Sequence, residues 1–250
     1  MLSLFAIGLM LLTIIGGSIP LWSKNWSERR MNSLLTFSGS FLLGITILHL
    51  IPETVSTGNS WSGVLILFGF FLQQAIQRFT HGIEHGHTHI AHHNHQHSVS
   101  LLPVIIGLSF HAFSEGLPLG VHYAEQMTLP SLYLAVSLHK LPEAMLVTSL
   151  VYSRKHQKRG AWISLLLFST ITPIAALLTH YLGTQYSSIH TLVEWCIPII
   201  TGSFIHISTT IFFESGTRSH DMNWKKWLLI ILGIGLACTT LVGGVQQHVH

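Results

Sequence analysis

The chain alternates between long apolar stretches and short polar connectors. Each apolar stretch extends over about 20 residues, the length that an α-helix needs to cross the hydrocarbon core of a bilayer. The pattern predicts eight membrane-spanning helices, at residues 2–22, 32–53, 61–79, 100–123, 130–152, 161–183, 192–213 and 226–245. All connectors are short except the one at 80–99, so we expect a single transmembrane domain over residues 1–250.

The composition supports a membrane environment. Only 8% of the residues are charged and 48% are hydrophobic, and the mean hydropathy is +0.51. Soluble domains contain roughly 25% charged residues, so we predict an all-α integral membrane protein. The two cysteines, Cys196 and Cys238, both fall in apolar stretches, and no disulfide framework is expected.

The lysines and arginines are concentrated in alternate connectors. Eleven of the twelve follow the first, third, fifth or seventh predicted helix, namely Lys24, Arg29, Arg30, Arg78, Arg154, Lys155, Lys158, Arg159, Arg218, Lys225 and Lys226. The connectors after the even-numbered helices contain none. Because cytoplasmic loops are enriched in Lys and Arg, we expect both termini outside and the odd-numbered connectors in the cytoplasm. The expected location is the cell membrane, inner or plasma.

The long connector at 80–99 is rich in histidine. Of the 19 histidines in the chain, eight lie here: His81, His85, His87, His89, His92, His93, His95 and His97. Imidazole suits zinc, copper, nickel and iron, but the irregular spacing does not build one closed tetrahedral site. We expect weak, exchangeable metal capture by a disordered cytoplasmic loop; the alternative is a solvated polar loop without a specific role.

Two predicted helices contain ionisable residues near their middle. In "HAFSEG", His111 and Glu115 are four residues apart, and in "HKLPEA" the same is true of His139 and Glu143. Each pair therefore shares one helical face, and the two antiparallel helices bring both pairs to a similar depth. Ionisable residues within a membrane are costly and read as functional. Two His and two carboxylates are suitable ligands for Zn²⁺ or a similar divalent ion.

A proline follows each of these pairs closely or lies within it. Pro118 would free the carbonyl of Ser114, and Pro142 would free that of Leu138. Broken helices with free carbonyls hold cations in many transporters. The alternative is an ordinary kink in each helix, with the His and Glu side chains only pairing with each other.

Two further pairs mark candidate routes to and from this site. His49 and Glu53 share a face near the outer end of their helix and suggest an entry route. His206 and Glu214 lie on the seventh predicted helix and suggest an exit route. An interfacial position in contact with water explains either pair equally well. The other histidines at helix ends, including His180 and His190, are expected to be solvated.

The sequences "HAFSEG" and "HKLPEA", with "HLIPE" at 49–53, resemble the ZIP (Zrt-, Irt-like protein) family of metal transporters. The resemblance implies eight transmembrane helices with both termini outside and a His-rich loop after the third. It also implies an inverted repeat of helices one to three and six to eight around helices four and five. Gly-Ser-Phe recurs at 39–41 and 202–204, in helices two and seven. The transport site implied is His111, Glu115, His139 and Glu143.

The chain departs from two-metal members of the family at two positions. An acidic residue follows the first ligand of helix five in those members, whereas here Lys140 follows His139. The sixth helix has Thr172 where a second carboxylate is expected. Both departures favour one metal ion, and we expect the Lys140 ammonium to approach Glu115 or Glu143 and to block a second ion.

The predicted function is secondary transport of Zn²⁺ into the cytoplasm, with Fe²⁺, Mn²⁺ and Cd²⁺ as further candidate substrates. The direction follows from the resemblance alone. Zinc is expected as cargo, with no catalytic cofactor; the expected partners are the metal ion, membrane lipid and, if the chain assembles, a second copy in a homodimer, but no nucleic acid. The alternatives are an exporter using the same site, or an intramembrane zinc hydrolase. A hydrolase would need a general base besides its ligands, and "HEXXH" is absent.

Overall fold

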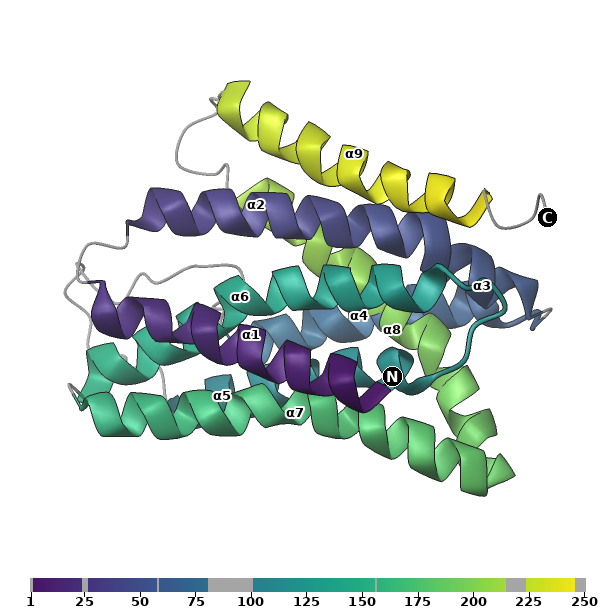
Figure 1. The fold of residues 1–250 in the computed structure, drawn as a ribbon, viewed down its shortest axis with the longest axis horizontal. Helices are drawn as coiled ribbons and strands as arrows, with labels where there is room; N and C mark the ends of the chain where they lie inside the picture. Colours follow the sequence, from purple (N-terminus) through teal and green to yellow (C-terminus); the bar gives the residue numbers. More distant parts are fainter. Residues whose placement is uncertain are drawn as a thin grey trace.

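The computed structural model describes residues 2–23, 27–57, 59–80, 101–155, 157–214 and 224–245, and these contain helices and turns but no strand. The helices are α1 (Leu2–Trp22), α2 (Glu28–Ile45), η1 (Thr46–Leu50), α3 (Ile51–Ser56), α4 (Ser62–Thr80), α5 (Leu101–Gly116), η3 (Leu117–Gly120), α6 (Thr128–Lys155), α7 (Lys158–Gln185), α8 (Ser187–Glu214) and α9 (Trp224–Val245) (Figure 1). When η1 and α3 are counted as the continuation of α2, and η3 as that of α5, the predicted boundaries differ from the observed ones by no more than five residues.

Seven of the helical segments in the described part are long and apolar enough to cross a membrane: α1, Arg29–Ser56, Leu101–Gly120, α6, α7, α8 and α9. The protein is therefore a multi-pass membrane protein. The remaining long helix, α4, has 19 residues, but three glutamines and Arg78 in its second half lower its hydropathy. The prediction of eight spans depends on this helix.

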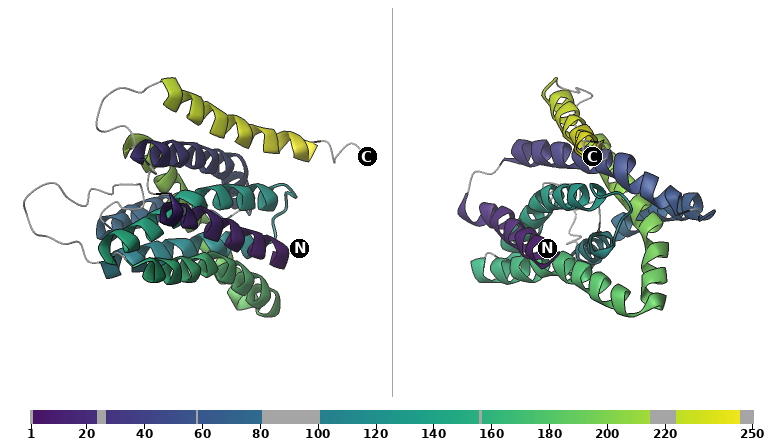
Figure 2. Two further views of the ribbon diagram at one scale, coloured as in Figure 1. Left: turned by 60° about the vertical axis from the view of Figure 1, so that its left-hand side comes forward. Right: turned by 45° about the vertical axis from the view of Figure 1, so that its right-hand side comes forward.

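The long helices form a bundle in which neighbours in sequence run in opposite directions (Figures 1 and 2). The beginning of α1 and the end of α9 lie at the same end of the bundle as the connectors from α3 to α4 and from α5 to α6. Helix α6 packs against α1, α2 and α7, whereas α9 packs only on α2 and η1 among the main contacts. The side chains of α6 are consequently mostly buried, and those of α9 mostly exposed.

Small residues allow α4 and α8 to pack closely. A Cβ atom at Gly69 of α4 would collide with the backbone of Ile199, and one at Gly202 of α8 would collide with the backbone of Ile66. Without a hydrophobic driving force between helices in lipid, such backbone contact contributes much of the association. Gly202 belongs to the second Gly-Ser-Phe tripeptide, so close packing is the observed role of that glycine.

A π-helical turn and two of the prolines are notable features of the helices near the predicted ligands. Helix α2 passes through the π-helical turn η1 before Pro52 begins the next α-helical turn, and π-turns are frequent at functional sites. Pro142 lies inside α6, as predicted. Pro118 differs from the prediction: α5 ends at Gly116, and Pro118 lies in the following 3₁₀ turn η3. The proline therefore ends the α-helix rather than kinking it, because its ring has no N–H with which to continue the α-helical pattern.

Candidate metal site

The structure brings the four predicted ligands together between α5 and α6. Ligand atoms of His111, Glu115, His139 and Glu143, here called the quartet, all lie within 4.8 Å of one another. His111 Nε2 is 2.8 Å from Glu143 Oε1 and 3.1 Å from Glu115 Oε1. His139 Nε2 is 3.7 Å and 3.9 Å from the same two oxygen atoms. Each side chain is no more than 1% exposed.

Local helix geometry and antiparallel packing explain the convergence. The i,i+4 spacing places His111 with Glu115, and His139 with Glu143, one helical turn apart on the same face. The rings of His111 and His139 meet edge to face, with centroids 6.2 Å apart. Both Nε2 atoms are directed at the Oε1 atoms of both glutamates, so two nitrogen and two oxygen donors surround one point. This donor set suits a tetrahedral divalent ion such as Zn²⁺.

Lys140 occupies the other side of the two carboxylates. Its Nζ is 2.5 Å from Glu143 Oε2 and also forms an ion pair with Glu115 Oε2. The side chain is 1% exposed, and its ammonium lies 4.9 Å from the ring centroid of Phe168. Each glutamate thus presents Oε1 to the imidazoles and Oε2 to the ammonium. The predicted approach of Lys140 to a carboxylate is confirmed, and the structure adds that the ammonium pairs with both glutamates.

The residue expected to replace a second carboxylate also lies beside the quartet. Thr172 of α7 is buried, and its hydroxyl donates a 2.7 Å hydrogen bond to the carbonyl of Ala112 in α5. This bond ties α7 to the turn between His111 and Glu115. Thr172 therefore supports the helix that carries two of the predicted ligands, and its hydroxyl proton is already donated to the backbone.

The predicted entry pair lies apart from the quartet. His49 is fully buried in η1, where Nε2 is 2.7 Å from Thr240 Oγ1 of α9 and Nδ1 is 3.6 Å from Glu125 Oε2. Glu53 Oε1 accepts a 2.7 Å hydrogen bond from the backbone N–H of Glu125. The two side chains thus face the connector between η3 and α6, not each other.

The predicted exit pair is only half described. His206 is 5% exposed, its Nε2 is 2.7 Å from Gln77 Oε1, and its ring meets that of Phe70 edge to face. Glu214 is the last residue of α8, but its side chain is outside the described residues. The same holds for the eight loop histidines, His81, His85, His87, His89, His92, His93, His95 and His97, which all lie in the undescribed connector.

Sequence reasoning missed the partners that come from distant helices. Glu125 lies beside His49, and Gln77 beside His206, although each partner is at least 76 positions away in sequence. The hydrophobic pattern contains no signal for these contacts. The three glutamines of α4 were a partial signal, because uncharged polar residues in a membrane helix often hydrogen-bond to a neighbouring helix; Gln73 does so with Ser203.

Comparison with known proteins also indicates a zinc transporter. The family described as "ZIP Zinc transporter" matches residues 81–240, which include both helices of the quartet. Zinc transporter ZIP9-A of Xenopus laevis is 23% identical over 88% of this chain and 86% of its own length. Zinc transporter ZIP9 of Micropogonias undulatus is 22% identical over the same shares. Since the family match covers more than half of the chain, the protein belongs to the ZIP zinc transporter family.

Proposed function

We propose that this protein is a secondary transporter that moves Zn²⁺ across its membrane into the cytoplasm by binding the ion at the quartet. The observation that carries the proposal is the convergence of His111, Glu115, His139 and Glu143 on one buried point. Burying four ionisable side chains in membrane helices costs free energy, and binding of an ion would offset that cost. Fe²⁺, Mn²⁺ and Cd²⁺ are further candidate substrates, to be ranked by competition with zinc.

The quartet is proposed to hold one ion at a time. A second ion would need the Oε2 atoms of Glu115 and Glu143, and Lys140 Nζ is paired with both. The ammonium gives the two carboxylates a fixed counter-charge when no metal is bound. When Zn²⁺ engages the Oε1 atoms, the ammonium remains close enough to repel it. Lys140 is therefore proposed to block a second ion and to favour release of the first.

Helix contacts support the proposed inverted repeat of eight spans. The first three spans are α1, α2 and α4, and the last three are α7, α8 and α9. In an inverted repeat α1 is equivalent to α7, α2 to α8 and α4 to α9, and α5 is equivalent to α6. The contact of α2 with α9 should then match the contact of α8 with α4, and the contact of α1 with α6 should match that of α7 with α5. All four helix pairs are in contact.

The distribution of charge supports the proposed orientation. Among the described residues, Arg29 and Arg30 lie in the first turn of α2, Lys158 and Arg159 begin α7, and Lys225 follows the first residue of α9. Because neighbouring helices alternate in direction, these cations gather at the end of the bundle opposite to the beginning of α1. The positive-inside rule assigns that end to the cytoplasm and both termini to the outside.

The two further histidine–glutamate pairs are proposed as parts of the route. His49 and Glu53 lie toward the end of the bundle assigned to the outside, where Glu125 adds a carboxylate. His206 lies in the second half of α8, toward the cytoplasmic end, with Gln77, and Glu214 follows at the end of the helix. The ion would enter past the first pair and leave past the second.

Zinc uptake by proteoliposomes tests the function. Purified protein is reconstituted, an inward zinc gradient is applied, and a zinc-sensitive dye inside the vesicles records uptake. We expect saturable uptake that Glu143→Gln abolishes, because the amide lacks the negative charge and half of the acceptor capacity of the carboxylate. Ser153→Ala, near the end of the same helix, is the matched control. Uptake that Glu143→Gln leaves intact would contradict the proposal.

Sidedness distinguishes an importer from an exporter. A cysteine introduced at residue 90, in a chain with both native cysteines changed to serine, should react with an impermeant maleimide only when that reagent is inside right-side-out cells or vesicles. Net accumulation of zinc on the loop side then establishes import, and the reverse establishes export. Zinc-dependent hydrolysis of lipid or peptide without zinc flux would instead support the hydrolase, although both carboxylates of the quartet are already engaged by the imidazoles and Lys140.

A further inference from the structure

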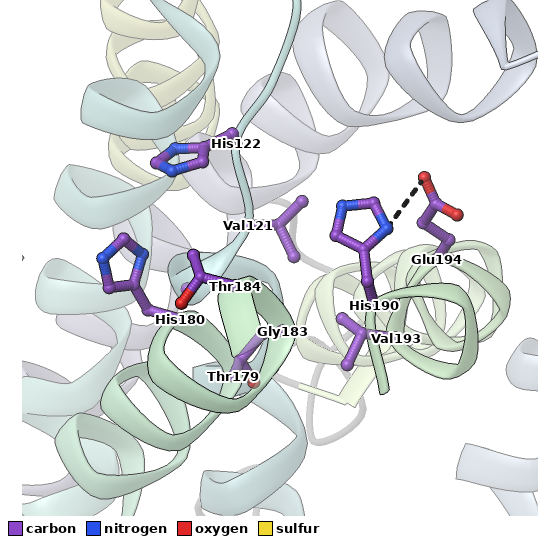
Figure 3. Close-up of a pocket in the computed structure, with 10 residues that line it drawn as sticks. Val121, His122, Thr179, His180, Gly183, Thr184, His190, Val193 and Glu194 are labelled. Atoms are coloured by element: carbon purple, nitrogen blue, oxygen red, sulfur yellow. Dashed lines mark ion pairs between the residues drawn. The ribbon is translucent and has the colours of Figure 1, made fainter. Parts of the chain in front are cut away.

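A second group of metal-ligating side chains surrounds a small pocket where η3, the last turns of α7 and the first turns of α8 meet (Figure 3). The pocket encloses about 30 Å³, enough for about two water-sized groups. We call it the His122 pocket; its lining includes Val121, His122, Thr179, His180, His190 and Glu194. None of the ten lining residues is lysine or arginine, so no cation of the lining competes with a bound metal.

The rings of His122 and His180 lie close together. Their centroids are 5.3 Å apart and their planes meet at 88°. Two imidazoles that share one tetrahedral Zn²⁺, with metal–nitrogen distances of about 2.0–2.1 Å, have ring centroids roughly 5 Å apart. The separation of these two rings is thus compatible with one shared ion.

A second pair lies across the pocket. His190 Nδ1 is 3.5 Å from Glu194 Oε1, one helical turn along α8. Figure 3 shows this pair on the other side of Val121 from His122 and His180. The side chains are 56% and 51% exposed, so both are able to change rotamer without repacking the protein. Both residues already line the pocket, so either is a candidate third ligand.

One residue of the pocket lining, Thr179, has a buried polar atom without a hydrogen-bond partner in the described part of the chain. Thr179 is 6% exposed, and its hydroxyl oxygen has no hydrogen-bond partner within the described structure. A buried hydroxyl without a partner costs free energy, which a water bound to the ion would recover. This observation is independent of the histidines and also indicates a polar occupant.

The connector that carries His122 is held in place. The hydroxyl of Tyr123 donates a 2.9 Å hydrogen bond to the carbonyl of Pro118. Burial and then the charge of Glu53 raise the pKa of Tyr123 well above its usual range, so this hydroxyl keeps its proton. Gly120 faces the backbone of Ala176 so closely that a Cβ atom there would collide with it. Together these contacts fix the connector against α7, and hence His122 near His180.

We propose that the His122 pocket is an exchangeable capture site for Zn²⁺, or a similar imidazole-preferring divalent ion, with His122 and His180 as its first ligands and water, His190 or Glu194 completing the shell. The pocket is linked to the quartet through α7, because Thr172, which bonds to the backbone of α5 between His111 and Glu115, lies eight residues before His180, or about 12 Å along the helix. Its role in uptake rests on the proposed transport function, whereas the binding itself does not.

Residue-resolved chemical labelling tests the binding. Purified full-length protein is treated with diethyl pyrocarbonate, which acylates accessible imidazoles, with and without Zn²⁺, and each histidine is quantified by mass spectrometry. We expect micromolar Zn²⁺ to lower the labelling of His122 and His180 several-fold, and Mg²⁺ at the same concentration to have no effect, because Mg²⁺ prefers oxygen ligands. Equal labelling of both residues with and without Zn²⁺ would overturn the proposal.

Variants test the role in uptake. The double variant His122→Gln/His180→Gln should raise the KM for zinc about three- to tenfold and leave the maximal rate unchanged; Tyr186→Gln, an exposed change at the same end of α7, should do neither. An unchanged KM would overturn the capture role. Zinc protection of both histidines in a protein that transports nothing would support the pocket while contradicting the proposed transport, so the two failures are distinguishable.

Discussion

The quartet and the His122 pocket contain the same types of side chain, histidine and glutamate, but the first is buried and the second is largely exposed. In the quartet, two imidazoles and two carboxylates are at most 1% exposed, and the ammonium of Lys140 is paired with both carboxylates. In the pocket, His190 and Glu194 are more than half exposed, and no lysine or arginine contributes to the lining. The spacing of histidine and glutamate is four residues in both places.

The two sites differ in what compensates the negative charge of their carboxylates. Water and salt screen an exposed carboxylate, so Glu194 is stable without a cation beside it. Two carboxylates withdrawn from water are strongly destabilised unless a cation accompanies them. The buried site consequently carries its own cation, Lys140, which would repel a metal ion bound there. An ion bound at the proposed pocket site would only displace water. We therefore expect strong effects of substitution at the quartet and graded effects at the pocket.

The largest expected effect is loss of a ligand from the quartet. Changing an outer partner of a metal ligand typically lowers affinity about 10–100-fold, so His139→Ala should lower zinc uptake at least about 100-fold. Ser137→Ala, two residues earlier in α6, is the control and should keep uptake near that of the wild type. If His139→Ala and the double variant of the pocket lower zinc uptake by the same few-fold, the expected difference between the two regions is wrong.

The second prediction concerns Lys140 and the number of ions. In a chain that lacks residues 81–97 and carries the pocket double variant, only the quartet should bind zinc tightly. We expect Lys140→Asp to bind one divalent ion more than its parent, because a carboxylate replaces the repelling ammonium, and Lys140→Met to bind the same single ion. Metal-to-protein ratios after equilibrium dialysis measure this. Two ions bound by the parent would show that Lys140 does not block a second site.

The same lysine should stabilise the protein when no metal is bound. Removing one partner of a buried ion pair typically costs about 3–5 kcal/mol, so Lys140→Met should lower the thermal midpoint in chelator and regain more of it than the wild type when Zn²⁺ is added. Thermal unfolding in detergent, with and without zinc, gives both values. Equal zinc-induced shifts in variant and wild type would argue that the ammonium is not the counter-charge of Glu115 and Glu143.

A smaller effect is expected at the glycine beside the pocket. Gly120→Ala places a methyl group against the backbone of Ala176, and overpacking of this kind typically costs about 1–3 kcal/mol. Gly183→Ala, which also lines the pocket but has open space around the added methyl group, should change stability by less than about 1 kcal/mol. Similar thermal midpoints for the two variants would contradict the close contact of η3 with α7.

The smallest effect on turnover is expected from the His-rich connector. Deleting residues 81–97 should leave zinc uptake measurable, because the quartet is built on α5 and α6, and should change its dependence on zinc concentration instead. Replacing the eight histidines by serine at constant length is the matched control for a shortened loop. If the deletion and the serine variant both abolish uptake while expression stays normal, the eight histidines are required for transport, which would contradict this prediction.

The sequence by itself determined the helices and the ligand pairs. Runs of about 20 apolar residues define a membrane helix without knowledge of its neighbours, and an i,i+4 pair shares one face whatever surrounds it. The sequence also shows the alternating cations and the position of Lys140 between His139 and Glu143. The predicted approach of Lys140 to a carboxylate is confirmed. These properties depend on contacts within one or two turns of a helix or between helices adjacent in the chain.

Only the tertiary structure decided which pairs share a site. Histidine and glutamate stand four residues apart at His49, His111, His139 and His190, yet only the second and third pairs converge. His180, expected to be solvated at a helix end, is partly buried, and its ring also contacts that of His122, 58 positions away. In lipid, close contact at small residues such as Gly69, Gly120 and Gly202 determines which helices pack together. This packing involves residues far apart in the chain, so the hydrophobic pattern does not predict it.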